Sequence, residues 1–393
     1  MTAVLRCRVC ERTQPLAPQS VCAVCDGPLD VGYDLGVASF FGAAGPRSMW
    51  RYEQLLPHPV ADRTTPGGTP LVPAPRLSTA LGVDLLLKLE GANPTHSFKD
   101  RIAAAAVAAA QQYGLETLCC TSTGNLGEAV AARAASAGLE AVVLCPAENA
   151  EVAPTASYGA RVVAVDGSFD ECRDLEQQLE SFFPWGFLGG NLHALAAEGA
   201  KTIAYEIVEQ LGGHTPDAVV APVASGTLFS KLAQGFDEAL AVGLSRGRRP
   251  RLFGAQAGGC PPLAAAWADD RPLSRVRPQT EVRSLAIGDP AFGDLAVGAA
   301  RMSGGSIHCV PEDEIADRTA LLAETTGVLA DSAGGVALGA LVDMVRNGVI
   351  EEGERVVLVV TGTGLKPYPV EVDVASSVVE GNVETLLTAL GLD

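Results

Sequence analysis

The chain has 393 residues, more than one hydrophobic core usually serves, which predicts two lobes and an appendage. Hydrophobic residues make up 48% and charged residues 19% of the sequence, a balance that excludes an intrinsically disordered chain. The formal net charge of −18 repels phosphate backbones, so we expect no nucleic-acid partner.

Two Cys-x-x-Cys pairs, Cys7–Cys10 and Cys22–Cys25, lie near the N-terminus. Two such turns can present four thiolates to one Zn(II) ion, and a site made only of cysteines is structural rather than catalytic. Disulfides or a redox motif are the alternatives. Residues 1–34 are therefore predicted to form a zinc-ribbon-like segment with a four-cysteine zinc knuckle. The metal ligands are expected to be Cys7, Cys10, Cys22 and Cys25.

The start of the chain lacks the apolar stretch of a signal peptide, and no charge-free run of about 18 apolar residues occurs anywhere. We therefore expect no membrane association. The remaining cysteines are scattered through apolar segments, a distribution typical of a reducing compartment. These features together predict a cytoplasmic location.

Residues 35–82 are predicted to be a connector and N-terminal arm, because the stretch 57–76 is rich in Pro, Gly and Thr. From residue 83 onward, short apolar runs alternate with longer Ala-rich helical patterns. This alternation predicts an α/β fold with parallel sheets covered by helices on both faces. The predicted strands are Val83–Leu89, Thr117–Thr121, Ala141–Cys145, Arg161–Val165, Ala218–Val223, Arg251–Ala255, Ser306–Val310 and Arg355–Val360. The predicted helices are Ile102–Tyr113, Gly127–Ala137, Ala200–Leu211, Leu228–Leu240, Asp313–Thr325 and Gly334–Asn347.

Four loops follow predicted strands and are candidates for ligand binding, because ligands of parallel sheets lie beyond the carboxyl ends of the strands. Each is rich in Gly, Ser, Thr or Asn, and small residues before a helix let backbone N–H groups approach an anion. Taken singly, each loop could equally be an ordinary tight turn. The four are Gly91–Arg101, Ser122–Gly127, Ala224–Leu228 and Thr361–Lys366.

Lys99 lies in the first of these loops, directly before an Ala-rich helix. Ser97 and Asp100 form a capping pattern, which predicts that Lys99 lies in the first helical turn. The positive end of the helix dipole favours a neutral, nucleophilic amine there, as Schiff-base chemistry requires. An ordinary surface lysine near a helix start is the alternative from local sequence alone.

Four motifs occur together in one order: NPTHSFKDR at Asn93–Arg101, STGN at Ser122–Asn125, EGAKT at Glu198–Thr202 and TGTGLK at Thr361–Lys366. In order and spacing the chain resembles the threonine synthase family, from the N-terminal cysteines to about residue 370. The resemblance implies the tryptophan-synthase-β-like fold (fold type II) of enzymes that use pyridoxal 5'-phosphate (PLP). It implies a large PLP-binding lobe of residues 83–114 and 205–393, a smaller mobile lobe of residues 115–204, and a homodimer.

The resemblance also implies a role for each matching residue. Lys99 corresponds to the catalytic lysine that forms a Schiff base with PLP. Asn125 would bind the phenolic oxygen of the cofactor, Thr361 would face its pyridine nitrogen, and the segment 225–227 would hold its phosphate. The loop 122–124 would receive the carboxylate of a small amino-acid substrate. The expected cofactor-binding residues are Phe98, Lys99, Asn125, Ala224, Ser225, Gly226, Thr227 and Thr361. The expected substrate-binding residues are Ser122, Thr123, Gly124, Asn125, His193 and Lys201.

The sequence departs from the family pattern near the EGAKT motif. Family members generally place an arginine a few residues before this motif, but the stretch 191–197 contains none. His193 or Lys201 is expected to substitute, although a single imidazole replaces a bidentate guanidinium poorly. Asp331 and Ser332 also stand where relatives often carry Glu followed by Pro or Thr.

These observations predict a threonine synthase-like lyase that converts O-phospho-L-homoserine and water to L-threonine and phosphate. The absent arginine motivates an alternative, a related PLP enzyme that replaces or eliminates a β- or γ-substituent of another amino acid. Cysteate synthesis or specialised metabolism would be examples. A non-catalytic, zinc-bearing protein is a third hypothesis, which the joint presence of Lys99, Asn125 and Thr361 disfavours.

Overall fold

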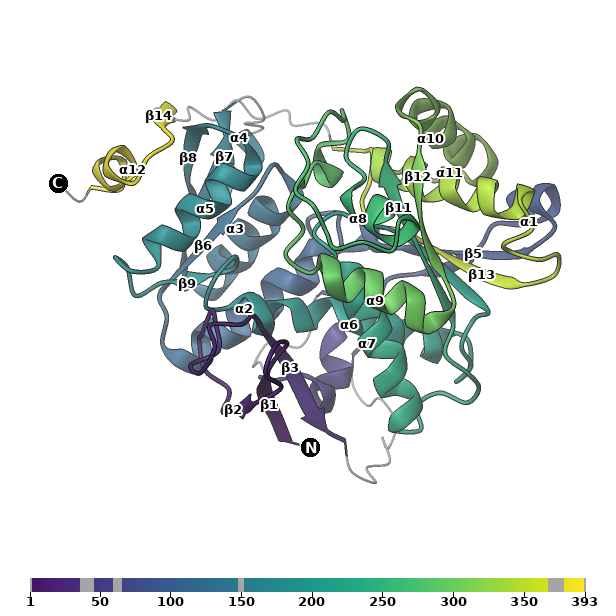
Figure 1. The fold of residues 1–393 in the computed structure, drawn as a ribbon, viewed down its shortest axis with the longest axis horizontal. Coiled ribbons are helices and arrows are strands. Elements are labelled where there is room, and N and C mark those ends of the chain that lie inside the picture. The colour runs from purple at the N-terminus through teal and green to yellow at the C-terminus, as the bar shows by residue number, and fades with distance from the viewer. Residues whose placement is uncertain (1, 36–45, 59–65, 148–151, 367–377, 392–393) are drawn as a thin grey trace.

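The computed structural model describes residues 2–35, 46–58, 66–147, 152–366 and 378–391. Two parallel-type sheets covered by helices form two lobes, and a small antiparallel sheet lies at the N-terminal end (Figure 1). The predicted α/β class is confirmed. Each of the eight predicted strands is present, with ends that differ by at most a few residues.

The larger sheet has six strands in the order β12-β11-β10-β13-β5-β4. Its strands are parallel except for the edge strand β4, which runs antiparallel to β5. The central strands are buried almost throughout, because their sequences are continuous apolar runs that require helices on both faces. The strands are β4 (Leu71–Pro73), β5 (Asp84–Leu89), β10 (Ala218–Pro222), β11 (Arg251–Ala257), β12 (Ser306–Val310) and β13 (Arg355–Val360).

The smaller sheet has five parallel strands in the order β14-β8-β7-β6-β9. Its edge strand β14 comes from the C-terminal end of the described chain and pairs with β8. Residues 205–393 are predicted above to belong to the larger lobe, whereas the segment 378–391 packs on the smaller sheet through buried Val379 and Leu386. The strands are β6 (Thr117–Thr121), β7 (Glu140–Pro146), β8 (Arg161–Asp166), β9 (Gly186–Phe187) and β14 (Val378–Glu380).

Helices cover the sheets, and the six predicted helices correspond to α2, α3, α6, α7, α10 and α11. Helices α2 and α6 cross closely at Gly199. A Cβ at this position would lie 2.0 Å from the carbonyl oxygen of Arg101, so the crossing requires glycine. The helices are α1 (Pro75–Leu81), α2 (Lys99–Tyr113), α3 (Asn125–Ala137), α4 (Val152–Ser157), α5 (Phe169–Leu179), α6 (His193–Gln210), α7 (Thr227–Ala241), α8 (Pro262–Ala268), α9 (Gly293–Ser303), α10 (Glu312–Thr326), α11 (Ser332–Arg346) and α12 (Val383–Ala389).

The N-terminal segment is an antiparallel sheet of β1 (Thr2–Cys7), β2 (Thr13–Gln14) and β3 (Leu29–Asp34). It lies against α6 and α7, where Asp30 pairs with Lys231 at 2.6 Å. The backbone N–H of Gln19 donates to the carbonyl of Asn191 at 2.8 Å, which ties the segment to the turn before α6. The segment is therefore docked on the body of the protein. Among the described helices, none has the length and apolar character needed to span a membrane.

Candidate active site

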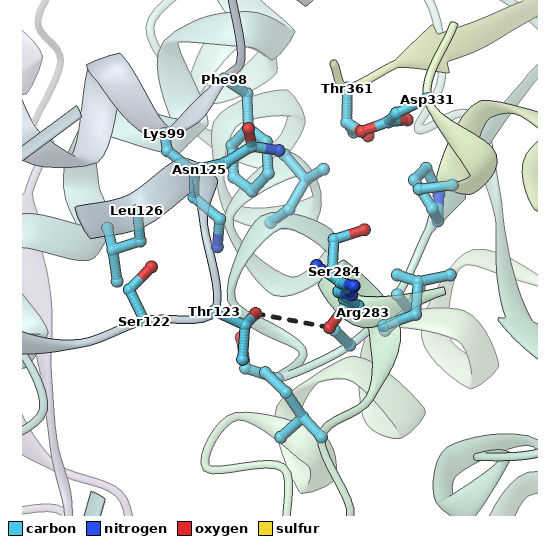
Figure 2. A pocket seen from close by; sticks show the side chains of 18 of the residues that line it. Phe98, Lys99, Ser122, Thr123, Asn125, Leu126, Arg283, Ser284, Asp331 and Thr361 are labelled. Carbon is cyan, nitrogen blue, oxygen red and sulfur yellow. Dashed lines mark hydrogen bonds between the residues drawn. The ribbon is translucent and has the colours of Figure 1, made fainter. Parts of the chain in front are cut away.

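The four candidate loops meet at one cavity, beyond the carboxyl ends of strands from both sheets (Figure 2). Each of the four loops contributes residues to the wall. The 3-10 turn Arg283–Leu285 closes another side. The predicted residues that line this cavity are Phe98, Lys99, Ser122, Thr123, Asn125, Ala224, Ser225, Gly226 and Thr361.

Lys99 is the first residue of α2, as predicted, but the predicted capping pattern is wrong. Among the described residues, none caps the start of α2 with its side chain, and none forms a hydrogen bond with the buried hydroxyl of Ser97. The carboxylate of Asp100 instead accepts hydrogen bonds from the backbone N–H and hydroxyl of Thr95, at 2.7 and 2.8 Å. Asp100 thereby fixes the loop before the helix and the backbone that carries Lys99.

The amine of Lys99 points into the cavity and lies 4.6 Å from the centre of the Phe98 ring. Burial penalises the charged form and lowers the pKa of Lys99 to about 8. A substantial fraction of the side chain is therefore a neutral amine near physiological pH, the form that attacks a carbonyl carbon.

We expect this lowered pKa to control how fast the cofactor-free protein takes up PLP. Because only the neutral amine reacts, the rate constant should rise with pH and level off above about 8. Absorbance measured from about pH 6 to about pH 10 checks this expectation. A rate constant that still rises steeply at about pH 10, as the pKa of ~10.4 of an ordinary lysine would give, would contradict it.

The loop Ala224–Leu228 leads into α7 and is shaped to hold an anion. Gly226 has φ +86, and a Cβ there would lie 2.4 Å from the carbonyl oxygen of Phe292, so this position requires glycine. The hydroxyls of Ser225 and Thr227 lie 3.0 Å apart beside the N-terminus of α7. Hydroxyls and N–H groups at a helix N-terminus suit a phosphate group. The segment therefore fits the predicted cofactor phosphate.

Asn125 begins α3, and its orientation is held by Lys366 from the TGTGLK motif. The Lys366 amine donates to Oδ1 of Asn125 at 2.6 Å and to Glu128 at 2.7 Å. With Oδ1 used in this way, the amide N–H₂ is the end of Asn125 available as a donor in the cavity. A donor there fits the phenolic oxygen of PLP.

Thr361 lines the cavity beside Asp331 (Figure 2), and its carbonyl accepts a hydrogen bond from the N–H of Phe98 at 3.0 Å. Burial raises the pKa of Asp331 to about 6, although its carboxylate caps α11 by accepting from Gly334. Both oxygen-bearing side chains therefore lie on the wall that the pyridine ring was predicted to face.

The loop predicted to receive the substrate carboxylate divides between two cavities. The Ser122 hydroxyl accepts from the N–H groups of Gly124 and Gly127, at 3.1 and 2.8 Å, so it shapes the turn itself. Thr123 lies between the Lys99 cavity and a neighbouring one, and Gly124 lines only the neighbour. Thr123 Oγ1 donates to the carbonyl of Arg283 at 3.5 Å, which joins this loop to the opposite wall (Figure 2).

A larger cavity of about 550 Å³ continues from Lys99 toward the N-terminal segment. His193, the first residue of α6, lines it and packs edge-on against Phe292 with ring centres 4.7 Å apart. Burial and the nearby positive charges of Arg8, Lys231, Arg173 and Lys99 lower the pKa of His193 to about 3. His193 is therefore a neutral imidazole in this cavity.

The four N-terminal cysteines form a separate cluster. Their sulfur atoms all lie within 4.8 Å of one another, and Sγ of Cys7 is 3.5 Å from Sγ of Cys25. Each of the ten cysteines in the chain is a free thiol, which the disulfide alternative does not predict. Four converging thiols are a donor set that suits a tetrahedral Zn(II) ion.

Comparisons with known proteins identify the family. Residues 63–362 match a family model described as pyridoxal-phosphate dependent enzyme. The threonine synthase of Methanosarcina acetivorans is 34% identical over 384 residues, which cover 94% of this chain and 94% of that protein. The threonine synthase of Mycobacterium leprae is 36% identical over 316 residues, which cover 78% and 86%. This chain belongs to the threonine synthase family.

Solved structures with the same fold extend beyond the threonine synthase family. Maize serine racemase has a TM-score of 0.65 at 20% identity and covers 76% of this chain and 90% of its own. Diaminopropionate ammonia lyase from Escherichia coli has a TM-score of 0.66 at 20% identity and covers 80% and 88%. These likenesses confirm fold type II, and the family implies a PLP cofactor at the Lys99 cavity.

One substrate ligand predicted as a substitute for the missing arginine is corrected by the structure. Lys201 is fully buried on α6, and its amine lies 2.6 Å from Glu198 and 2.9 Å from Glu238. It is absent from the described residues that line the two cavities at Lys99. Because its charge is already neutralised inside the protein, Lys201 cannot replace the absent arginine. His193 remains in the cavity.

Two arginines of the larger cavity were missed from the sequence. Arg8 lies between the first two cysteines and Arg173 lies on α5, and neither belongs to a motif of the threonine synthase family quoted above. No local pattern marks Arg173. For Arg8, the sequence offered one signal that the side chain could have a fixed position. Arg8 lies inside a predicted metal-binding turn, and such a turn has a fixed backbone.

Proposed function

We propose that this chain is a PLP-dependent threonine synthase-like lyase, which converts O-phospho-L-homoserine and water to L-threonine and phosphate. The observation that carries the proposal is the amine of Lys99, which lies where the four candidate loops meet in one cavity. Identity of 34% to a threonine synthase over nearly the whole chain supports the same reaction.

The residues of the cavity suit the steps this reaction needs. Ser225, Gly226 and Thr227 would hold the cofactor phosphate, and the amide of Asn125 would hold its phenolic oxygen. The bound cofactor supplies an electron sink for the negative charge that develops on the substrate α-carbon. Lys99, with a pKa near 8, is suited to take the α-proton and return it as a general base and acid.

A direct assay tests the reaction. Purified holoenzyme is incubated with O-phospho-L-homoserine, and threonine and free phosphate are measured. The proposal expects both products in equal amounts. Retained cofactor with no turnover would instead favour the alternative, β- or γ-replacement on another amino acid, which the arginine-free stretch 191–197 motivates.

We further propose that Cys7, Cys10, Cys22 and Cys25 bind one structural Zn(II) ion. The support is the convergence of four thiols, with backbone N–H groups of Val9, Cys10 and Val24 directed at the sulfurs. We expect about one zinc per chain by elemental analysis. Cys22→Ser should lose that zinc, whereas Cys309→Ser, an exposed cysteine elsewhere, should keep it. Equal zinc in both variants would contradict the assignment.

A further inference from the structure

The larger cavity joins the Lys99 site to the N-terminal segment and is lined by cations from separate elements. Arg8 follows β1, Arg173 lies on α5, and the neutral His193 begins α6. Lys99, Ser225 and Thr227 line the same cavity. A molecule that bonds at Lys99 therefore has space to extend toward these two guanidinium groups.

The guanidinium of Arg8 has unused hydrogen-bonding capacity. Both of its terminal nitrogens share one carbonyl, that of Ala291, at the long distances of 3.4 and 3.5 Å. Its Nε atom is buried and has no partner among the described residues, where no carboxylate forms an ion pair with Arg8 either. The group lies over the Phe292 ring at 4.7 Å, which fixes the plane of the fork. Arg8 is thus positioned without a direct ion pair among the described residues, although the carboxylates of Asp30 and Asp294 lie near enough to act on its charge.

Arg173 is oriented in a similar way. Its two terminal nitrogens donate to the backbone oxygen and carboxylate of Asp289, at 2.6 and 2.8 Å. Its Nε atom is also buried without a partner among the described residues. The carboxylates of Asp289 at 2.8 Å, Asp174 at 3.5 Å and Asp170 at 3.8 Å orient the guanidinium and offset part of its charge. The Nε edge is left as a hydrogen-bond donor.

The carboxylates of this cavity already accept hydrogen bonds from the protein. Glu176 accepts from the backbone N–H groups of Thr121 and Gly189, at 2.8 and 2.6 Å. Glu180 accepts from the hydroxyl of Ser20. Burial raises the pKa of Glu176 to about 7, so part of its population is neutral near physiological pH. The buried polar atoms of this wall that have no partner among the described residues are Nε of Arg8, Nε of Arg173 and the hydroxyl of Thr121. Each of the three can donate a hydrogen bond, which suits an anion.

We infer that Arg8 and Arg173 bind the anionic group on the side chain of the substrate while the amino-acid end lies at Lys99. The inference rests on the proposed function and deepens it, because it names the residues that replace the arginine missing before Glu198. Guanidinium forks match the oxygens of a phosphate ester, which fits O-phospho-L-homoserine. The cysteine-rich segment then has a direct role, since its first turn carries one of the two anion-binding residues.

Ligand titrations of the holoenzyme test this inference. Arg8→Met and Arg173→Met remove the charge but retain an apolar side chain, and Arg12→Met is the matched control, an exposed arginine of the same segment. Binding of O-phospho-L-homoserine and of L-homoserine, which lacks the anion, is followed by cofactor absorbance. Each test variant should weaken binding of the phosphorylated ligand by about 10-fold or more. Binding of L-homoserine should change by less than about 2-fold, and Arg12→Met should match the wild type for both ligands.

Several outcomes would overturn the inference. Equal loss of affinity for both ligands in the test variants would show a structural role, and unchanged affinity would show no role. Because Arg8 and Arg173 lie on separate elements, poor folding of one variant leaves the other as the test. If the wild type makes no threonine but binds the phosphorylated ligand through Arg8, the inference stands and the proposed reaction fails. If threonine forms with an unchanged KM in both variants, the reaction stands and the inference fails.

Discussion

Replacing Lys99 with alanine is expected to lower turnover of the amino-acid substrate by on the order of 1,000-fold or more. In the proposed function, one amine both bonds to the cofactor and moves the α-proton, so that its removal would abolish two functions at once. The fold should be unaffected, because the lysine side chain lies in the wall of a cavity and makes no ion pair among the described residues. Steady-state assays of threonine and phosphate release measure the loss.

Two controls separate lost chemistry from lost structure. The circular dichroism spectrum of Lys99→Ala should match that of the wild type. A small primary amine added to the assay should restore part of the activity, since it can enter the space left by the side chain and act as the base. A Lys99→Ala protein with wild-type turnover would remove Lys99 from the mechanism.

Replacing Arg101 with methionine is expected to lower the free energy of unfolding by about 3–5 kcal/mol. Arg101 lies two residues after Lys99 on α2 and is fully buried, and its guanidinium contacts Glu90 at 2.7 Å and Glu206 at 2.6 Å. Lys88 also pairs with Glu206, at 2.6 Å. Without Arg101, two buried carboxylates would share the single charge of Lys88. Guanidinium-induced unfolding, followed by circular dichroism, measures the change.

A surface arginine provides the matched control. Arg248 has a side chain 86% exposed and lies 3.7 Å from Asp217, so Arg248→Met should change stability by less than about 1 kcal/mol. Equal stability loss in the two variants would contradict this account of the network.

Acid should weaken the buried network as well. The positive charge of Arg101 and Lys88 lowers the pKa of Glu206. The stability that the Glu206 carboxylate contributes is therefore present above the ordinary carboxyl pKa and is lost as pH falls below that value.

The parts of the fold that were predictable from sequence are those with local signals. Buried parallel strands are continuous apolar runs, so β10 and β13 could be placed within a residue or two. The location of the candidate site could be predicted from two things: the rule that ligands bind beyond the carboxyl ends of such strands, and the specific motif around Lys99. Strand β14 was not predictable, because its three residues acquire a partner only when the chain returns to β8.

The features of the site that were mispredicted or missed depend on contacts between distant segments. Lys201 was expected to substitute for the missing arginine, but its charge is neutralised by Glu198 and by Glu238, which lies on the next helix. Arg8 enters the cavity only because the N-terminal segment docks near Ala291, 283 positions along the chain. The sequence near Lys99 resembled a capping box, whereas Asp100 turns back to Thr95. Pattern rules do not contain this tertiary information.

The central claim, that Lys99 bonds covalently to PLP, is tested most directly by borohydride reduction followed by peptide mass spectrometry. Borohydride reduces the carbon–nitrogen double bond and fixes the cofactor permanently on the residue that holds it. The account predicts that the label falls on the peptide containing Lys99 and that prior removal of the cofactor abolishes it. A label on another lysine, or a protein that takes up no PLP at all, would contradict the account.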